Sequence, residues 1–246
     1  MWHPSMWLRL PPNPHVILSW HIVGIVALTG YANVVANRVL DSLWYIPFNL
    51  AILGVAVAIA RHAGVTWTDM GLWRERLGRG LFVGGIVAAV IAIGIAIGVA
   101  VPGTREFLYD DRVVDSSTAL VLFNALVRIP IGTAFYEEML FRGVLFGMFA
   151  RKWAPLWAGL ASSALFGLWH ILPTIDTLDT NPAGDLFDGL MGVIIAALAA
   201  VAATAIVGVG FLWLRLRANS TVAPILAHIA TNSLALLAAL MVVRGF

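Results

Sequence analysis

The chain has 246 residues, of which 61% are hydrophobic and 11% are charged, and its formal net charge is +2. A soluble domain does not need so much apolar surface, and several apolar stretches reach the length of about 18 residues that lets a helix span a bilayer. The small net charge excludes a strongly basic nucleic-acid binder, and the absence of cysteine excludes disulfides and thiolate chemistry. We therefore predict an all-α, polytopic membrane helical bundle in which residues 1–246 form a single membrane domain.

Seven apolar stretches follow one another along the chain. The fourth is too long for one upright span, because 33 residues at 1.5 Å each reach roughly 50 Å against a hydrocarbon core of about 30 Å. It either tilts strongly or breaks near Arg128 and Pro130, where proline removes a helix hydrogen bond. We expect seven spans, with eight as the alternative if residues 118–128 form a separate piece. The predicted spans are about 16–36, 43–60, 80–101, 118–150, 155–172 (ending at Pro173), 189–214 and 221–243.

The connections between these spans differ in charge. Residues 61–79 and the short links after residues 150 and 214 are basic, whereas residues 102–117 and 173–188 are mostly acidic. Because cytoplasmic loops carry an excess of Lys and Arg, the N-terminus is predicted to be cytoplasmic. We expect a multi-pass protein of the cell (plasma) membrane, surrounded by the lipid bilayer.

Glycine within the third span suggests a helix contact. Gly94 and Gly98 form a small-xxx-small pair, a pattern that allows two membrane helices to approach closely. We interpret this pair as a packing surface and not as a ligand site.

A short stretch, FYEEMLFRGVLFG (135–147), places three charges in an apolar run. Ionised side chains at membrane depth are costly, and they are usually paired, buried in protein and functional. Glu138 precedes Arg142 by four residues, so the two share a helix face in the favourable order for an ion pair. Glu137 lies five residues before Arg142, about 140° around an α-helix, and points elsewhere. The spacing predicts a structural clamp, Glu138 with Arg142, and a carboxylate, Glu137, that is free for chemistry.

Two other spans carry polar side chains to similar depth. Counted from the basic face at 1.5 Å per residue, Glu137 lies roughly 20 Å deep, His170 roughly 22 Å, His228 roughly 13 Å and Asn232 roughly 20 Å. Three helices therefore bring polar groups to depths that allow one shared site. Arg128 is expected to snorkel to the outer boundary.

Three motifs carry a resemblance to a known family. EEMLFR (137–142) fits EExxxR, FGLWH (166–170) fits FxxxH, and HIATN (228–232) fits HxxxN. In order and spacing they resemble the CPBP family of CAAX-prenyl and bacteriocin-processing intramembrane proteases, also called the type II CAAX endopeptidase or Abi family. The resemblance covers residues 118–246, which would be the motif-bearing protease core.

The resemblance implies cleavage of a peptide bond in a membrane-associated peptide or protein. It implies that Glu137 is the general base that activates water, with His170 helping to bind that water. His228 and Asn232 would donate hydrogen bonds to the oxyanion, and Glu138 and Arg142 would hold the geometry. Two helix donors at i and i+4 can form such a pair, and one donor of this kind is worth roughly 10²–10³ in rate.

The participation of a metal is open at this point. Glu137, His170 and His228 would also suit a zinc site with an open position for water. The sequence lacks HExxH, and a metal-free glutamate mechanism uses the same residues, so we favour the metal-free mechanism.

Three other interpretations stand beside the protease. The charges would serve only as interhelical contacts in a non-catalytic membrane scaffold or a bacteriocin-immunity protein that keeps the fold. A transporter or proton relay would use the same buried acids, but no inverted internal repeat is visible.

Overall fold

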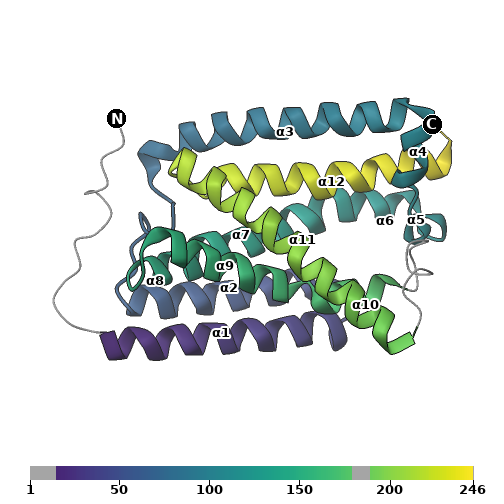
Figure 1. Ribbon diagram of the computed structural model, residues 1–246. Helices are drawn as coiled ribbons and strands as arrows, with labels where there is room; N and C mark the ends of the chain where they lie inside the picture. The colour runs from purple at the N-terminus through teal and green to yellow at the C-terminus, as the bar shows by residue number, and fades with distance from the viewer. Residues whose placement is uncertain (1–14, 179–188, 246) are drawn as a thin grey trace.

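The computed structural model describes residues 15–178 and 189–245, and this part of the chain is helical throughout, without strands (Figure 1). The long helices are α1 (His15–Arg38), α2 (Tyr45–His62), α3 (Leu77–Ala100), α9 (Pro155–Trp169), α10 (Ile171–Leu178), α11 (Gly189–Ala218) and α12 (Val222–Arg244). The short elements are η2 (Ser42–Trp44), η3 (Arg74–Arg76), α4 (Pro102–Arg105), η4 (Glu106–Leu108), α5 (Asp111–Val114) and α6 (Thr118–Phe123). A continuous helical run then follows as η5 (Asn124–Phe135), α7 (Tyr136–Glu138), η6 (Met139–Leu145) and α8 (Phe146–Ala150).

Seven helical runs in the described residues are long and apolar enough to cross a membrane, which confirms the predicted polytopic bundle. The fourth run extends from Thr118 to Ala150 without a break, so the alternative with a separate span at 118–128 was wrong. The run continues through Pro130 because η5 is a π-helix, in which the wider turn changes the hydrogen-bond register. From the neighbouring helix α2, the Asn49 side chain donates a hydrogen bond of 3.0 Å to the Gly132 carbonyl.

The fifth span also differs from its predicted end. Helix α9 ends at Trp169, and after His170 the chain turns into α10, which contains Pro173. We expected Pro173 to end the span, but it lies in the first turn of α10, where a helix tolerates a residue without an N–H group. Residues 179–188, the rest of the predicted acidic loop, lie outside the described residues.

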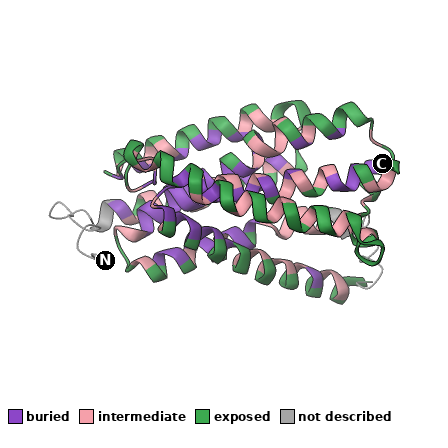
Figure 2. Cartoon of the chain, turned by 90° about the horizontal axis from the view of Figure 1, so that it is seen from above, coloured by how far each residue is buried: buried purple, intermediate pink, exposed green. Residues whose placement is uncertain are grey.

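The middle of the bundle is the helix that carries the EEMLFR motif. Every residue from Tyr136 to Phe149 is buried, and the buried residues gather along the interior of the bundle in Figure 2. Helices α1, α2, α9 and α11 contact this segment. A helix that is buried on all sides exposes none of its charges, so those in Tyr136–Phe149 must be satisfied by protein.

Helix α3 lies along α12 at one side of the bundle (Figure 1). The close approach occurs at Gly80 and Gly84, where an added Cβ would lie 2.6 Å from the Ser220 side chain and 2.9 Å from the Ala223 backbone. The sequence prediction of a close contact at Gly94 and Gly98 was wrong: a Cβ at Gly94 would meet nothing within 4 Å, and at Gly98 only Leu108 at 3.4 Å. The same small-xxx-small spacing therefore forms a close helix contact at Gly80 and Gly84 but not at Gly94 and Gly98.

The two ends of the bundle differ in charge as predicted. At one end lie the links between α2 and α3, between α8 and α9, and between α11 and α12, and these links together with the adjoining helix ends hold most of the basic residues of the described chain. The other end holds α4, η4, α5 and α10 with most of the acidic residues. There Arg38 of α1 forms an ion pair with Asp176 of α10.

The glycine contact gives a test of this packing. We expect Gly84→Ala to lower the stability in detergent by about 1–3 kcal/mol, because the new methyl group collides with the α12 backbone. Gly94→Ala, which adds the same methyl group to open space on the same helix, is the matched control and leaves the thermal unfolding midpoint unchanged or slightly higher. Equal midpoints for the two variants would contradict the contact.

Candidate active site

Glu138 joins two helices through one oxygen atom. Its Oε1 atom accepts hydrogen bonds from Arg142 Nη1 at 2.9 Å and from His228 Nδ1, on α12, at 2.9 Å. The ion pair that the spacing predicted between Glu138 and Arg142 is present, and all three side chains are buried. Because a carboxylate only accepts, Nδ1 of His228 holds the proton of this contact. Glu138 therefore fixes the orientation of the His228 ring as well as the position of Arg142.

Glu137 points to a different set of atoms. Its Oε1 atom accepts a hydrogen bond of 3.0 Å from Trp169 Nε1 at the end of α9. Its Oε2 atom is buried, has no hydrogen-bond partner and lies 4.0 Å from His228 Nε2. One carboxylate oxygen is thus held by an indole, and the other is left with its lone pairs free beside an imidazole nitrogen.

Aromatic rings enclose the charged groups. The Arg142 guanidinium lies 4.1 Å from the centre of the Phe166 ring and 5.2 Å from that of Phe211, and the His228 ring stacks on Phe211 at 5.0 Å. Such cation–π contacts compensate for Arg142 Nε and Nη2, which are buried without hydrogen bonds. Gly208 on α11 makes room for this arrangement, because a Cβ there would lie 3.0 Å from Arg142 Nη2.

His170 and Asn232 lie outside this contact set. The His170 ring packs against Phe166, and its Nδ1 donates a 2.8 Å hydrogen bond to the Phe166 carbonyl, which leaves Nε2 as the acceptor of the neutral ring. Asn232 lies one helical turn beyond His228 and lines a cavity. The structure therefore brings Glu137, Glu138, Arg142 and His228 together in one cluster. The other two predicted residues lie close to it along the chain: His170 follows Trp169, and Asn232 lies one turn after His228.

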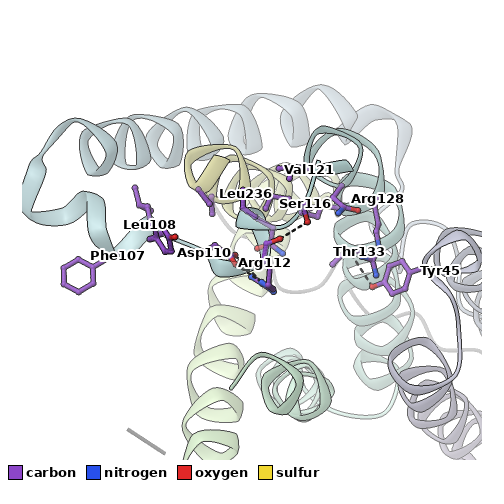
Figure 3. A pocket seen from close by; sticks show the side chains of 17 residues that line it. Tyr45, Phe107, Leu108, Asp110, Arg112, Ser116, Val121, Arg128, Thr133 and Leu236 are labelled. Atoms are coloured by element: carbon purple, nitrogen blue, oxygen red, sulfur yellow. Dashed lines mark hydrogen bonds and ion pairs between the residues drawn. The ribbon is translucent and has the colours of Figure 1, made fainter. Parts of the chain in front are cut away.

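A cavity of about 640 Å³ lies beside the first part of the fourth span and reaches η4 and α5 at the acidic end of the bundle (Figure 3). Its wall includes Thr133 and Asn232, which lie one turn from Glu137 and from His228 respectively. Its mouth is formed by residues of η4 and α5. A volume of this size is typical of ligand sites, and its wall comes within one helical turn of Glu137 and of His228. Arg128, which was expected to snorkel to the membrane boundary, lies in this wall instead.

An ion pair lies at the mouth of this cavity. Arg112 contacts the Asp110 carboxylate through Nε and through Nη2, the latter at 2.7 Å. The hydrogen bond from Arg112 lowers the pKa of Asp110 and, in return, raises the pKa of Arg112. Both groups therefore stay ionised near neutral pH, and their charges offset each other.

The arrangement of these side chains does not match that of a metal site. Within residues 15–178 and 189–245, no group of three or more His, Asp or Glu side chains is arranged to hold a metal ion. His170 Nε2 is not directed at the two glutamates by any contact, and one oxygen of each glutamate is already used by protein donors. The present arrangement does not fit a zinc site formed by Glu137, His170 and His228, and we assign no chemical step to a metal.

Sequence reasoning missed two residues that hold the site. Trp169, which binds Glu137, was recognisable in principle, because an indole N–H at membrane depth needs an acceptor and the residue precedes His170. Phe211 lies in a 30-residue helix that is apolar except at its basic C-terminal end, and no sequence signal marks it. Only the crossing of α11 over the central helix brings its ring to Arg142 and His228.

Comparison with known proteins agrees with the motifs. Residues 118–234 match the family model of the Rce1-like type II CAAX prenyl endopeptidases. The chain has no significant match among curated proteins and none among solved structures. The matched range contains all six predicted site residues and the whole of the fully buried helix.

The buried pair is expected to be essential to the fold. Arg142→Met leaves the Glu138 carboxylate buried with a single donor, and we expect it to lower the stability by about 3–5 kcal/mol. The control is Arg151→Met, which removes a partly exposed ion pair of 3.3 Å with Asp69 and costs about 1 kcal/mol or less. Thermal unfolding in detergent compares the two, and an equal effect would show that Glu138 does not depend on Arg142.

Proposed function

We propose that this multi-pass membrane protein, whose residues 118–234 form a domain of the Rce1-like type II CAAX prenyl endopeptidase family, is an intramembrane endopeptidase with a glutamate-activated water. Its substrate would be a membrane-associated peptide or protein. The observation that carries the proposal is the buried Glu137 carboxylate, which has one oxygen held by Trp169 and the other without a partner and lies one helical turn from Thr133 in the cavity wall.

Glu137 Oε2 would act as the general base. A water molecule next to it would transfer a proton to Oε2 while its oxygen bonds to the carbonyl carbon of the scissile peptide. When the tetrahedral intermediate breaks its C–N bond, Glu137 returns the proton to the leaving amine. The products are a carboxylate and an ammonium ion, because the second proton of the water passes from the new carboxyl group to the amine, and the base ends in its initial state. The hydrogen bond from Trp169 keeps the carboxylate in one orientation throughout.

His228 and Asn232 would stabilise the negative charge that develops on the carbonyl oxygen. The proton on His228 Nδ1 is held by Glu138, so a second proton on Nε2 would make the ring a donor on the side of Glu137. Charge balance supports this form: two carboxylates and one guanidinium leave a net charge of −1 in the buried cluster, and an imidazolium offsets it. Asn232 would supply the second donor from the next turn of α12.

His170 would contribute a lone pair. Its Nδ1–H is used by the Phe166 carbonyl, so Nε2 of the neutral ring accepts a hydrogen bond from water.

We assign residues 118–246 to the protease core within the single membrane domain, and α1, α2 and α3 to its enclosure.

The orientation in the membrane follows from the loop charges. We propose that the basic end of the bundle, where α1 begins, is cytoplasmic, and that the acidic end is extracytoplasmic. The cavity mouth at η4 and α5 then faces away from the cytoplasm, and substrate enters from that side.

Glu137→Gln tests the proposed base. The amide keeps an oxygen for Trp169 but cannot take a proton, so we expect the rate of cleavage to fall by roughly 10²–10⁴. The assay uses purified protein in detergent with a prenylated peptide that ends in a C-a-a-X sequence. Glu106→Gln, which removes an exposed carboxylate at the acidic end, is the control and keeps the wild-type rate. A folded Glu137→Gln protein with wild-type activity would overturn the proposal.

The orientation has its own test. The chain has no native cysteine, so single cysteines at the exposed positions Glu75, on the basic end, and Gly103, on the acidic end, report each side. In intact cells a membrane-impermeant maleimide is expected to label Gly103→Cys and to spare Glu75→Cys until the membrane is opened. The opposite labelling would reverse the orientation and place the cavity mouth in the cytoplasm.

A further inference from the structure

Asn33 connects the first span, α1, with the end of α9. Its side chain is buried, and its Nδ2 atom donates a hydrogen bond of 2.6 Å to the Trp169 carbonyl. The other end of the same amide is occupied as well, because Asn37 Nδ2 donates to Asn33 Oδ1 at 3.3 Å. The amide of Asn33 is therefore held in one orientation, with its donor directed at the backbone of α9.

The Trp169 carbonyl depends on this donor because of the local sequence. In a continuous helix it would accept from the N–H group of residue 173, four positions later, but this residue is Pro173 and has no N–H. The helical pattern resumes one residue further on, where the Thr174 N–H donates to the His170 carbonyl at 3.0 Å. Asn33 thus supplies, from another helix, the hydrogen bond that the turn between α9 and α10 cannot provide.

This end of α9 carries the side chain that holds the proposed base. Trp169 Nε1 donates a hydrogen bond of 3.0 Å to Glu137 Oε1, and the Trp169 ring lies 5.8 Å from the ring of Tyr136 and 5.9 Å from that of Phe141. Contacts between rings are compatible with a range of geometries, whereas a hydrogen bond weakens steeply as its angle departs from linear. The backbone position of Trp169 therefore decides whether its N–H group reaches Glu137.

We propose that Asn33 is a positioning residue of the active site, because its hydrogen bond to the Trp169 carbonyl sets the indole N–H against Glu137 Oε1. This inference rests on the proposed endopeptidase function. It gives α1, which lies outside the matched family domain, a part in the reaction beyond enclosure. A second contact agrees with it: Arg38 of α1 forms an ion pair with Asp176 of α10, so α1 holds the chain on both sides of the turn.

Asn33→Leu, which keeps the approximate size of the side chain but has no donor, tests this role. With a prenylated peptide that ends in a C-a-a-X sequence, we expect kcat to fall roughly five- to fiftyfold, because the Trp169 carbonyl loses its partner and the indole moves away from Glu137. KM is expected to stay within about twofold of wild type, since Asn33 does not contact the substrate. Asn33→Ala removes the same donor without adding an apolar branch, and the same loss is expected.

The matched control is Thr29→Val. Thr29 lies one turn before Asn33 on α1 and is also buried, but its hydroxyl donates to the Ile25 carbonyl within the same helix, at 2.8 Å. We expect this variant to keep the wild-type kcat. Thermal unfolding in detergent shows whether each variant is folded, and an equal loss of kcat in Thr29→Val and Asn33→Leu would overturn the inference.

Trp169→Phe separates positioning from a general effect on the fold. This change removes the indole N–H and is expected to lower kcat by itself. Because Asn33 acts through that N–H, Asn33→Leu in the Trp169→Phe background lowers kcat by less than about twofold further. A structural role of Asn33 would reduce kcat by the same factor in both backgrounds, and such additivity would contradict the proposal.

A measurement without substrate distinguishes this inference from the proposed function. The ten tryptophans are labelled with fluorotryptophan, and the fluorine resonance of Trp169 is the one that Trp169→Phe removes. We expect Asn33→Leu to shift this resonance and Thr29→Val to leave it in place. An unchanged resonance, or equal kcat in wild type and Asn33→Leu, would overturn the positioning role and keep the endopeptidase. A shifted resonance in folded protein that cleaves no peptide would keep the contact and overturn the endopeptidase itself.

Discussion

The buried Glu138 carboxylate is the contact on which the arrangement of the site depends. A single oxygen of this side chain accepts from Arg142 in its own helix and from His228 on α12, in a region where water is excluded. Burying one charge without a partner costs several kcal/mol, so the central helix and α12 are held in one relative position. Phe166 and Phe211 complete the enclosure from α9 and α11, because their rings cover the part of Arg142 that has no hydrogen bond. Four helices thereby share one charged centre.

This arrangement explains why two adjacent glutamates differ in their surroundings. Glu138 points to Arg142 and His228, and Glu137 points to Trp169 and to the other nitrogen of His228. The same imidazole therefore lies between both carboxylates, hydrogen-bonded to Glu138 through Nδ1 and 4.0 Å from Glu137 through Nε2. A proton on Nδ1 is fixed by Glu138, so any change of protonation during a reaction would take place at Nε2, next to Glu137 Oε2. Such a pairing resembles the way in which a buried carboxylate orients the catalytic histidine of Ser-His-Asp hydrolases.

Much of the fold could be predicted from the sequence because the bilayer imposes a length and a polarity on every span. The seven spans, the charge difference between the two ends and the pairing of Glu138 with Arg142 all follow from local rules of length, loop composition and spacing. The failures are non-local. Gly80 and Gly84 approach α12 whereas Gly94 does not, and the choice depends on where two helices cross. Pro130 does not break its helix because π-helical turns accommodate it, and these cannot be read from the span itself. Phe211 could not be found for the same reason.

The long fourth span connects the charged centre with the cavity. An ordinary upright span needs only about 20 residues, but this run has 33, and its first part carries Arg128 and Thr133 in the wall of the cavity while its buried part carries Glu137. The π-helical turns between them set which of these side chains face the same side, since a wider turn moves residues five apart towards a common face. Glu137 and Arg128 thus sit on one continuous element with few ways to move relative to each other. A rigid element of this kind keeps the wall of the cavity and the buried carboxylate at a constant separation.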